Sequence, residues 1–281
     1  MANKMLYVSD MHLELRPNLN YNKLFQQSAK YLILAGDIGN PVKEKQAYTN
    51  FLKTASSHFQ HIFYVLGNHE YYNNQRIPMF DMKDKICHIC SQFPNIHILD
   101  NNTYELDNIT ILGATLWSQA LMTESVYCND YRMIWSSQLQ SQTSSSPTLQ
   151  TSSPLSILET NNITVEQTNT LHTEAVLWLK DNISKSSRPC LVITHHAPLV
   201  NKPGYYLSHP RYTKTSCFQT DLSHLLCNKV KIWVYGHTHY SNDFNFLTTR
   251  VCSNQVGYEK EQLVFDYSKH IDLDQLWIDD I

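Results

Sequence analysis

Five short segments of the chain carry side chains of the kinds that bind metal ions. They contain carboxylate, amide and imidazole groups, a mixture that suits borderline metals such as manganese, iron or zinc. In chain order they are Ser9-Asp10-Met11-His12, Gly36-Asp37-Ile38, Gly67-Asn68-His69-Glu70, Thr194-His195-His196 and Gly236-His237-Thr238-His239. Any one of them alone is typical of a turn or a helix cap. Five in one chain indicate a shared metal centre.

Each segment directly follows a short apolar run of strand length, rich in β-branched and aromatic residues. The runs, including one that no such segment follows, are 5–8, 31–35, 62–66, 109–114, 190–194 and 231–235. Residues 47–59 and 171–183 show the apolar spacing of helices. Strands alternating with helices predict an α/β fold with covered sheets. Because the carboxyl ends of strands in an open α/β sheet form one rim, the five segments are expected to meet there.

The length and the continuous pattern of the chain predict one domain, residues 1–281. The stretch 136–156 is rich in Ser, Thr and Gln and has no periodicity, so we expect a low-complexity surface insertion there. A lid or partner-binding loop is the alternative, since long loops in compact domains often have such a function.

Charge and cysteine content limit the partners and the compartment. The chain has 22 Lys and Arg against 25 Asp and Glu, with no dense basic run. This argues against a dedicated nucleic-acid binder but permits a small anionic substrate. The seven cysteines are odd in number and scattered, which favours a reduced compartment. No signal peptide or membrane-spanning run is evident, so we expect a cytoplasmic protein without a membrane partner.

The ordered motifs resemble the signature of the calcineurin-like metallophosphoesterase superfamily: Asp-x-His, Gly-Asp, Gly-Asn-His-Asp/Glu, a later His, and Gly-His-x-His. The phrases SDMHLEL, VLGNHEYY, ITHHAP and GHTH, together with Asn129-Asp130-Tyr131-Arg132, resemble a branch of uncharacterised bacterial and plant members. The resemblance covers nearly the whole chain outside the Ser-rich stretch. It implies a four-layered α/β/β/α sandwich and a hydrolase of phosphoric esters.

The resemblance also implies roles for seven side chains. Asp10, His12 and His239 would hold one metal ion, Asn68, His195 and His237 the other, and Asp37 would bridge both. A shared carboxylate offsets the repulsion between cations about 3.5 to 4 Å apart. Water between two cations loses a proton near neutral pH, so a bridging hydroxide is the expected nucleophile on phosphorus.

Other polar side chains receive weaker interpretations. His69, next to Asn68, is the candidate for protonating the leaving oxygen, and Arg132 is a candidate phosphate contact. For His196, a buried imidazole bonded to backbone and a role beside the metal ligands both stay open. Cys87 and Cys90 lie in a helix-like stretch without a second cysteine pair, which favours core packing over a zinc site.

Several functions fit this fold. A phosphodiesterase or phosphatase with a small or nucleotide-like substrate is the leading hypothesis. A phosphoprotein phosphatase is disfavoured because residues 36–40 read Gly-Asp-Ile-Gly-Asn rather than Gly-Asp followed by Asp-Arg-Gly. A metal-dependent nuclease is disfavoured because no basic patch is interleaved with aromatic residues. A non-catalytic scaffold is disfavoured because all seven ligands are present.

Overall fold

The computed structural model describes residues 2–137, 160–202, 206–207, 216–261, 263 and 265–275, and it contains two large β-sheets. The first sheet has the order β13 (His270–Asp272), β1 (Lys4–Val8), β2 (Tyr31–Ala35), β3 (His61–Val65) and β4 (Ile96–Ile98). In it β1 to β4 are parallel and β13 is antiparallel to β1. All the apolar runs predicted as strands in this sheet are confirmed to within one residue.

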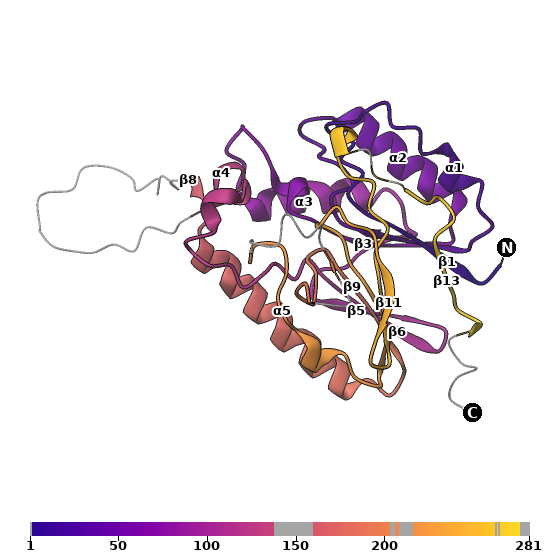
Figure 1. The fold of residues 1–281 in the computed structure, drawn as a ribbon. Coiled ribbons are helices and arrows are strands. Elements are labelled where there is room, and N and C mark those ends of the chain that lie inside the picture. The colour runs from indigo at the N-terminus through magenta and orange to yellow at the C-terminus, as the bar shows by residue number, and fades with distance from the viewer. Residues whose placement is uncertain are drawn as a thin grey trace, which may run out of the picture.

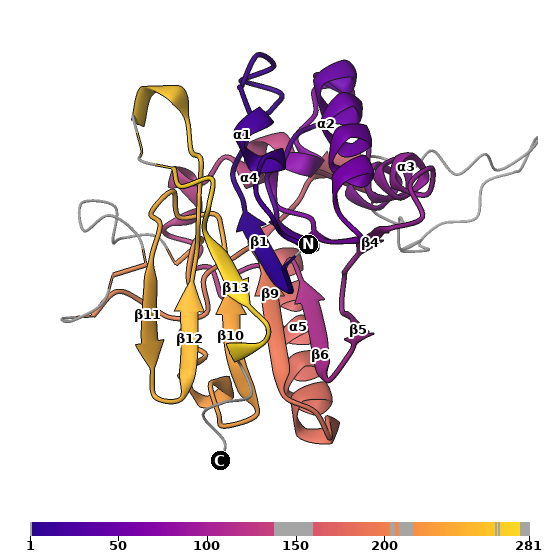
Figure 2. The ribbon, with the colours of Figure 1, turned by 90° about the vertical axis from the view of Figure 1, so that its right-hand side faces the viewer.

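The second sheet is also mainly parallel. Its order is β11 (Asp243–Phe246), β12 (Thr249–Cys252), β10 (Val230–Val234), β9 (Cys190–Thr194), β6 (Ile109–Ala114) and β5 (Asn102–Leu106). The central strands β12, β10, β9 and β6 are parallel, and the edge strands β11 and β5 pair antiparallel with their neighbours. Figure 2 shows this sheet face on, with α5 behind it.

The α-helices flank the two sheets. They are α1 (Asn22–Phe25), α2 (Lys45–His58), α3 (Met79–Cys90), α4 (Asp130–Met133) and α5 (Val165–Lys185). Figure 1 shows α1, α2 and α3 over the first sheet and α5 along the second. The predicted helix at 171–183 is confirmed as part of α5, and that at 47–59 is confirmed as part of α2 except for Phe59, which follows the last helical residue. A capping box between Thr164 and Gln167 satisfies backbone donors at the start of α5.

Three apolar clusters separate four layers, because successive side chains of a strand point to opposite faces of its sheet. In β1, Leu6 and Val8 pack toward α2 and α3, whereas Met5 and Tyr7 pack toward the second sheet. The outer face of the second sheet packs on α5, for example through Leu179. This is the α/β/β/α arrangement that the resemblance implied.

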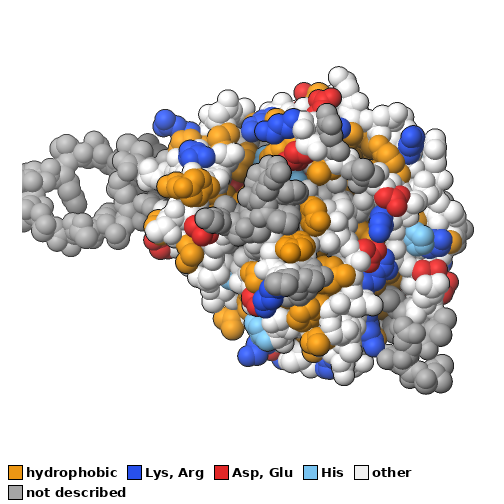
Figure 3. Space-filling view, viewed as in Figure 1, with side chains coloured by type: hydrophobic (Ala, Val, Ile, Leu, Met, Phe, Trp, Pro, Cys, Tyr) orange, Lys and Arg blue, Asp and Glu red, His pale blue; other side chains and the backbone are white. Residues whose placement is uncertain are grey.

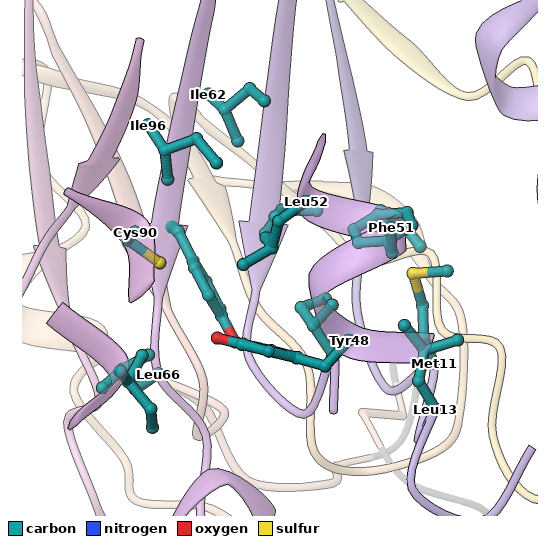
Figure 4. Close-up of a cluster of buried hydrophobic side chains, with 14 of the residues drawn as sticks. Met11, Leu13, Tyr48, Phe51, Leu52, Ile62, Leu66, Cys90 and Ile96 are labelled. Carbon is teal, nitrogen blue, oxygen red and sulfur yellow. The ribbon is translucent and has the colours of Figure 1, made fainter. Parts of the chain in front are cut away.

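The cluster beneath α2 and α3 includes a polar contact within an apolar environment. Figure 4 shows Tyr48, Phe51 and Leu52 of α2 facing Ile62 and the other apolar side chains of the first sheet. The Tyr48 hydroxyl donates to the Tyr64 hydroxyl at 3.2 Å, so both buried hydroxyls are satisfied. Cys90 is buried in the same cluster, in agreement with the interpretation that it is a core residue.

The Ser-rich stretch begins later than predicted. Ser136 and Ser137 belong to β7 (Trp135–Ser137), which pairs antiparallel with β8 (Thr160–Asn162). The backbone pairing and a hydrogen bond of 2.9 Å from Gln167 Nε2 to Ser136 Oγ order these residues despite their composition. The rest of the predicted insertion, 138–156, lies outside the described residues.

Two further expectations concern a membrane partner and a nucleic-acid-binding surface. No helix among the described residues is long and apolar enough to cross a membrane. On the face seen in Figure 3, the described Lys and Arg side chains are interspersed with acidic and apolar ones and form no continuous basic field.

Candidate metal centre

The five ligand-bearing segments meet at the carboxyl ends of strands from both sheets. The segments at Asp10, Asp37 and Asn68 follow β1, β2 and β3, and those at His195 and His237 follow β9 and β10. The expectation of a rim on one open sheet is therefore wrong in one respect. The centre lies where two packed sheets present their strand ends to each other, so each of its two groups of ligands draws residues from both sheets.

Strained backbone marks these segments. Five of the seven candidate ligands have left-handed backbone conformations, namely Asp10 (φ 55°), His12 (48°), Asp37 (54°), His237 (70°) and His239 (47°). Residues other than glycine adopt this region at a cost of about 1–3 kcal/mol each, and they concentrate at functional sites. The chain bends sharply after the strands in order to turn these side chains toward one another.

The first half of the centre contains Asp10, His12 and His239, whose ligand atoms lie within 4.8 Å of one another. The Nε2 atoms of His12 and His239 are 3.0 Å apart. The Nδ1 atom of His239 is 2.7 Å from Glu261, and that of His12 is 3.4 Å from Glu14. Because the carboxylates occupy both Nδ1 atoms, the two Nε2 atoms point at each other.

The second half contains Asp37, His195 and His237, which also lie within 4.8 Å of one another. His195 Nδ1 donates to the Ala35 carbonyl oxygen at 2.9 Å, and His195 Nε2 faces Asn68 Oδ1 at 2.9 Å. The buried Nε2 of His237 has no hydrogen-bond partner among the described residues.

Asp37 lies between the two halves. Its Oδ1 is 3.4 Å from His195 Nε2, and its Oδ2 is 3.9 Å from His12 Nε2. The same Oδ1 accepts the backbone N–H of His69 at 2.8 Å, which fixes the carboxylate. One carboxylate thus faces both groups of imidazoles, as a bridging ligand must.

The donor set fits metal cations for an electrostatic reason. Two imidazole Nε2 atoms at 3.0 Å, or an Nε2 and an amide oxygen at 2.9 Å, repel each other unless a positive charge lies between them. Burial alone would lower the pKa of His195, but Asp37 outweighs it and raises that pKa to about 9. Burial alone would also lower the pKa of His239, but hydrogen bonds with Asp10 and Glu261 outweigh it and raise that pKa to about 10. Burial lowers the pKa values of the other two imidazole ligands, His12 and His237, so these two rings favour the neutral form that binds metals.

Two glycines are required by close approach as well as by turns. A Cβ atom at Gly67 would collide with the Asp37 carboxylate, and one at Gly36 would collide with the His195 ring. Gly36 also has a φ of 88°, which favours glycine. The sequence alone indicated only a turn after each strand.

Glu70 is an extensively bonded side chain to which the sequence analysis assigned no role. Its carboxylate accepts the backbone N–H groups of Asp37 (2.9 Å), Ile38 (2.7 Å) and Gly67 (2.7 Å), and the Tyr64 hydroxyl (2.7 Å). It therefore shapes the turn that carries Asp37. The sequence feature that could have indicated a role for Glu70 is its place in the Gly-Asn-His-Glu motif.

Asp130 orients a candidate ligand from outside the five segments. Its Oδ1 accepts from Asn68 Nδ2 at 2.7 Å and from the Tyr72 hydroxyl at 2.5 Å. This contact turns the amide oxygen of Asn68 toward His195. Arg132 of the same segment is exposed and donates to Val126 O and Asn129 Oδ1 instead. Its role as a phosphate contact stays a prediction.

Replacing Asp130 with alanine is expected to lower metal affinity about 10- to 100-fold, the usual effect of removing a partner that orients a ligand. Asp130→Asn is the matched variant, because its amide oxygen can still accept from Asn68 and Tyr72. It should retain most of the wild-type affinity. Titration of metal-free protein with manganese measures both, and wild-type affinity in Asp130→Ala would contradict the assigned contact.

His69 and His196 lie beside the ligands in different ways. His69 Nδ1 is 3.0 Å from Glu14 Oε1, and its Nε2 is 3.1 Å from the Tyr258 hydroxyl. Burial lowers but Asp37 and Glu14 together raise the pKa of His69, with a net upward shift. His196 is buried, and its Nδ1 donates to the Thr115 carbonyl oxygen at 3.2 Å. The backbone bond fits one interpretation of His196, and its ring centroid lies 4.2 Å from that of His237, so a role beside the ligands stays a prediction.

Two groups of imidazole and carboxylate ligands that share an aspartate at strand ends define the class of dimetal hydrolases. Comparison with known proteins specifies the family. The profile of the calcineurin-like phosphoesterases matches residues 4–241. The uncharacterized protein L509 of Acanthamoeba polyphaga mimivirus is 34% identical over 295 residues, covering 98% of both chains. The chain belongs to the calcineurin-like phosphoesterase family and is a phosphoester hydrolase.

Solved structures share this fold at low sequence identity. Phosphopantetheinyl hydrolase (PptH) from Mycobacterium tuberculosis has a TM-score of 0.61 and 17% identity, covering 95% of both chains. The protein TT1561 of Thermus thermophilus has a TM-score of 0.54 and 11% identity, covering 98% of this chain and 96% of that one. These similarities extend over nearly the whole chain and agree with the α/β/β/α architecture.

Proposed function

We propose that this chain is a dinuclear metal-dependent phosphodiesterase or phosphatase with a small or nucleotide-like substrate. The observation that carries the proposal is the position of Asp37 between two sets of facing ligand atoms. Asp10, His12 and His239 hold one cation and Asn68, His195 and His237 the other, with Asp37 shared. Manganese, iron and zinc all suit this donor set.

Two cations held there would supply Lewis acidity for the activation of water and for the charge on the phosphoryl oxygens. The chain supplies the geometry. Glu70 holds the Asp37 turn, and Asp130 sets the orientation of Asn68. Glu14 and Glu261 fix the tautomers of His12 and His239, since each carboxylate faces an Nδ1 atom.

A groove beside the centre supports a small substrate. It has a volume of about 730 Å³, and His69, Tyr72 and Tyr258 are among the residues that line it. This lies within the range of about 300–1,000 Å³ that is usual for small-molecule sites.

The test is hydrolysis of bis-nitrophenyl phosphate and of nitrophenyl phosphate by chelator-stripped protein reloaded with manganese. We expect turnover that chelation abolishes. His239→Ala should reduce it at least about 100-fold, because it removes a ligand from a cation worth several kcal/mol in the transition state. Absence of turnover on both esters with two metals bound would contradict the proposal.

His69→Ala should slow poor leaving groups about 10²- to 10⁴-fold and nitrophenolate far less, because only a poor leaving group requires a proton donor. Initial rates on diphenyl phosphate and bis-nitrophenyl phosphate measure the difference. His58→Ala on the exposed side of α2 is the control and should change neither rate. Equal losses on both esters in His69→Ala would rule out proton donation.

A further inference from the structure

A turn in the C-terminal part of the chain, residues 256–261, packs against the metal centre. It lies beyond the matched family region, which ends at residue 241. The backbone N–H of Gly257 donates to the Asp10 carbonyl oxygen at 2.9 Å, and Arg16 Nη1 donates to the Gly257 carbonyl oxygen at 2.9 Å. Figure 1 shows the turn as a short yellow coil. Contacts with the N-terminal ligand segment thus hold the turn in place.

The side chains of this turn are fixed on the candidate ligands themselves. Glu261 Oε2 accepts from the backbone N–H of Tyr258 at 2.8 Å and lies 2.7 Å from His239 Nδ1. The Tyr258 ring packs against two imidazoles, tilted to His12 at a centroid distance of 4.6 Å and edge-on to His239 at 4.5 Å. Its position is therefore determined by the same residues that form the centre.

The hydroxyl of Tyr258 forms a hydrogen bond with Nε2 of His69, the ring nitrogen that does not face Glu14. His69 is held on one side by Glu14 at Nδ1 and on the other by Tyr258 at Nε2, and its ring stacks on Tyr72 at 4.2 Å. Both ring nitrogens of His69 are thus engaged. His69 and Tyr258 both line the groove, and the Tyr258 hydroxyl is the group bonded to His69 Nε2 there.

We propose that Tyr258 is a catalytic residue of this hydrolase, whose hydroxyl donates a hydrogen bond to the leaving-group oxygen of the substrate. His69 holds the hydroxyl in place by donating from its Nε2–H to the Tyr258 oxygen, while its Nδ1–H donates to Glu14, so the one hydroxyl proton is directed to the leaving oxygen. As the P–O bond breaks, negative charge develops on the leaving oxygen, and a prepositioned donor stabilises that charge. This inference rests on the proposed phosphoesterase function and assigns one of its contacts.

The experiment compares Tyr258→Phe with wild type on diphenyl phosphate and bis-nitrophenyl phosphate, using full-length protein loaded with manganese. The variant loses one hydroxyl and keeps the ring that packs on His12 and His239. We expect kcat on diphenyl phosphate to fall about 100-fold, as for other removed transition-state donors. On bis-nitrophenyl phosphate, whose leaving oxygen needs little stabilisation, the loss should be less than about 3-fold.

Tyr267→Phe is the matched control in the same part of the chain, because the Tyr267 hydroxyl donates only to the Asn20 carbonyl oxygen among the described residues. It should leave both rates unchanged. The double variant His69→Ala, Tyr258→Phe should be no slower than the slower single variant, since the two groups act as one unit.

Each outcome separates the inference from the proposed function. Metal-dependent turnover by the wild type tests the proposed function independently of Tyr258. Given that turnover, equal losses of Tyr258→Phe on the two esters, or no loss on diphenyl phosphate, would overturn the role of Tyr258. Multiplicative losses in the double variant would overturn its dependence on His69. A wild type inactive on every ester would overturn both.

Discussion

Asp37→Asn is expected to reduce phosphoester turnover at least about 1,000-fold, because it removes the charge that both cations share. The asparagine has the same size, and its oxygen can still accept the backbone N–H of His69. The fold should therefore persist while metal content falls at both positions. His239→Ala, in contrast, should lose metal at one position. Metal analysis of the purified variants, with initial rates on bis-nitrophenyl phosphate, measures these effects.

Asp181→Asn on α5 is the control for this substitution. Its side chain is 54% exposed and pairs with Lys185 one turn later. Such surface pairs contribute little, so both metal content and rate should stay at the wild-type level. Two metals per chain and wild-type turnover in Asp37→Asn would show that this carboxylate does not bridge.

Glu70→Ala is expected to lower the free energy of unfolding by about 4 kcal/mol, the largest stability effect we predict. The carboxylate is fully buried and accepts backbone N–H groups of Asp37, Ile38 and Gly67. Each buried donor left without an acceptor costs about 1–3 kcal/mol, and partial relaxation keeps the total below the sum. Urea unfolding of metal-free protein, followed by circular dichroism, measures the change.

Glu70→Gln provides an intermediate case, because one oxygen remains and the other becomes an N–H donor that opposes the backbone donors. Its loss of stability should lie between those of wild type and Glu70→Ala. Glu174→Ala on the exposed side of α5 should leave the unfolding midpoint unchanged. A Glu70→Ala variant as stable as wild type would mean that water replaces the carboxylate in the turn.

The sequence was sufficient for the strands and the candidate ligands because both are encoded locally. A parallel strand buried on both faces, such as β2 or β9, is a continuous apolar run that can be read directly. A ligand such as Asp10 or His237 stands immediately after its run. The order of these motifs then gave the family, which the profile match and the mimiviral relative bear out.

Short edge strands escaped prediction for the opposite reason. β4 has three residues, and β13 pairs with β1 from the far end of the chain. Neither has a periodicity that distinguishes it from a loop. The division of the strands into two packed sheets could not be predicted from the apolar runs either, because a strand covered by a second sheet is as apolar as one covered by helices.

Only the tertiary structure decided which side chains support the ligands. Asp130 meets Asn68 across 62 positions and Tyr258 meets His69 across 189, so neither pair forms a local motif. What the sequence determined was the chemistry available at each strand end. The packing of two sheets determined that these ends face one another, and it brought the C-terminal turn onto them. Side chains that orient ligands are chosen by proximity in space, and their residue types alone do not distinguish them from ordinary surface residues.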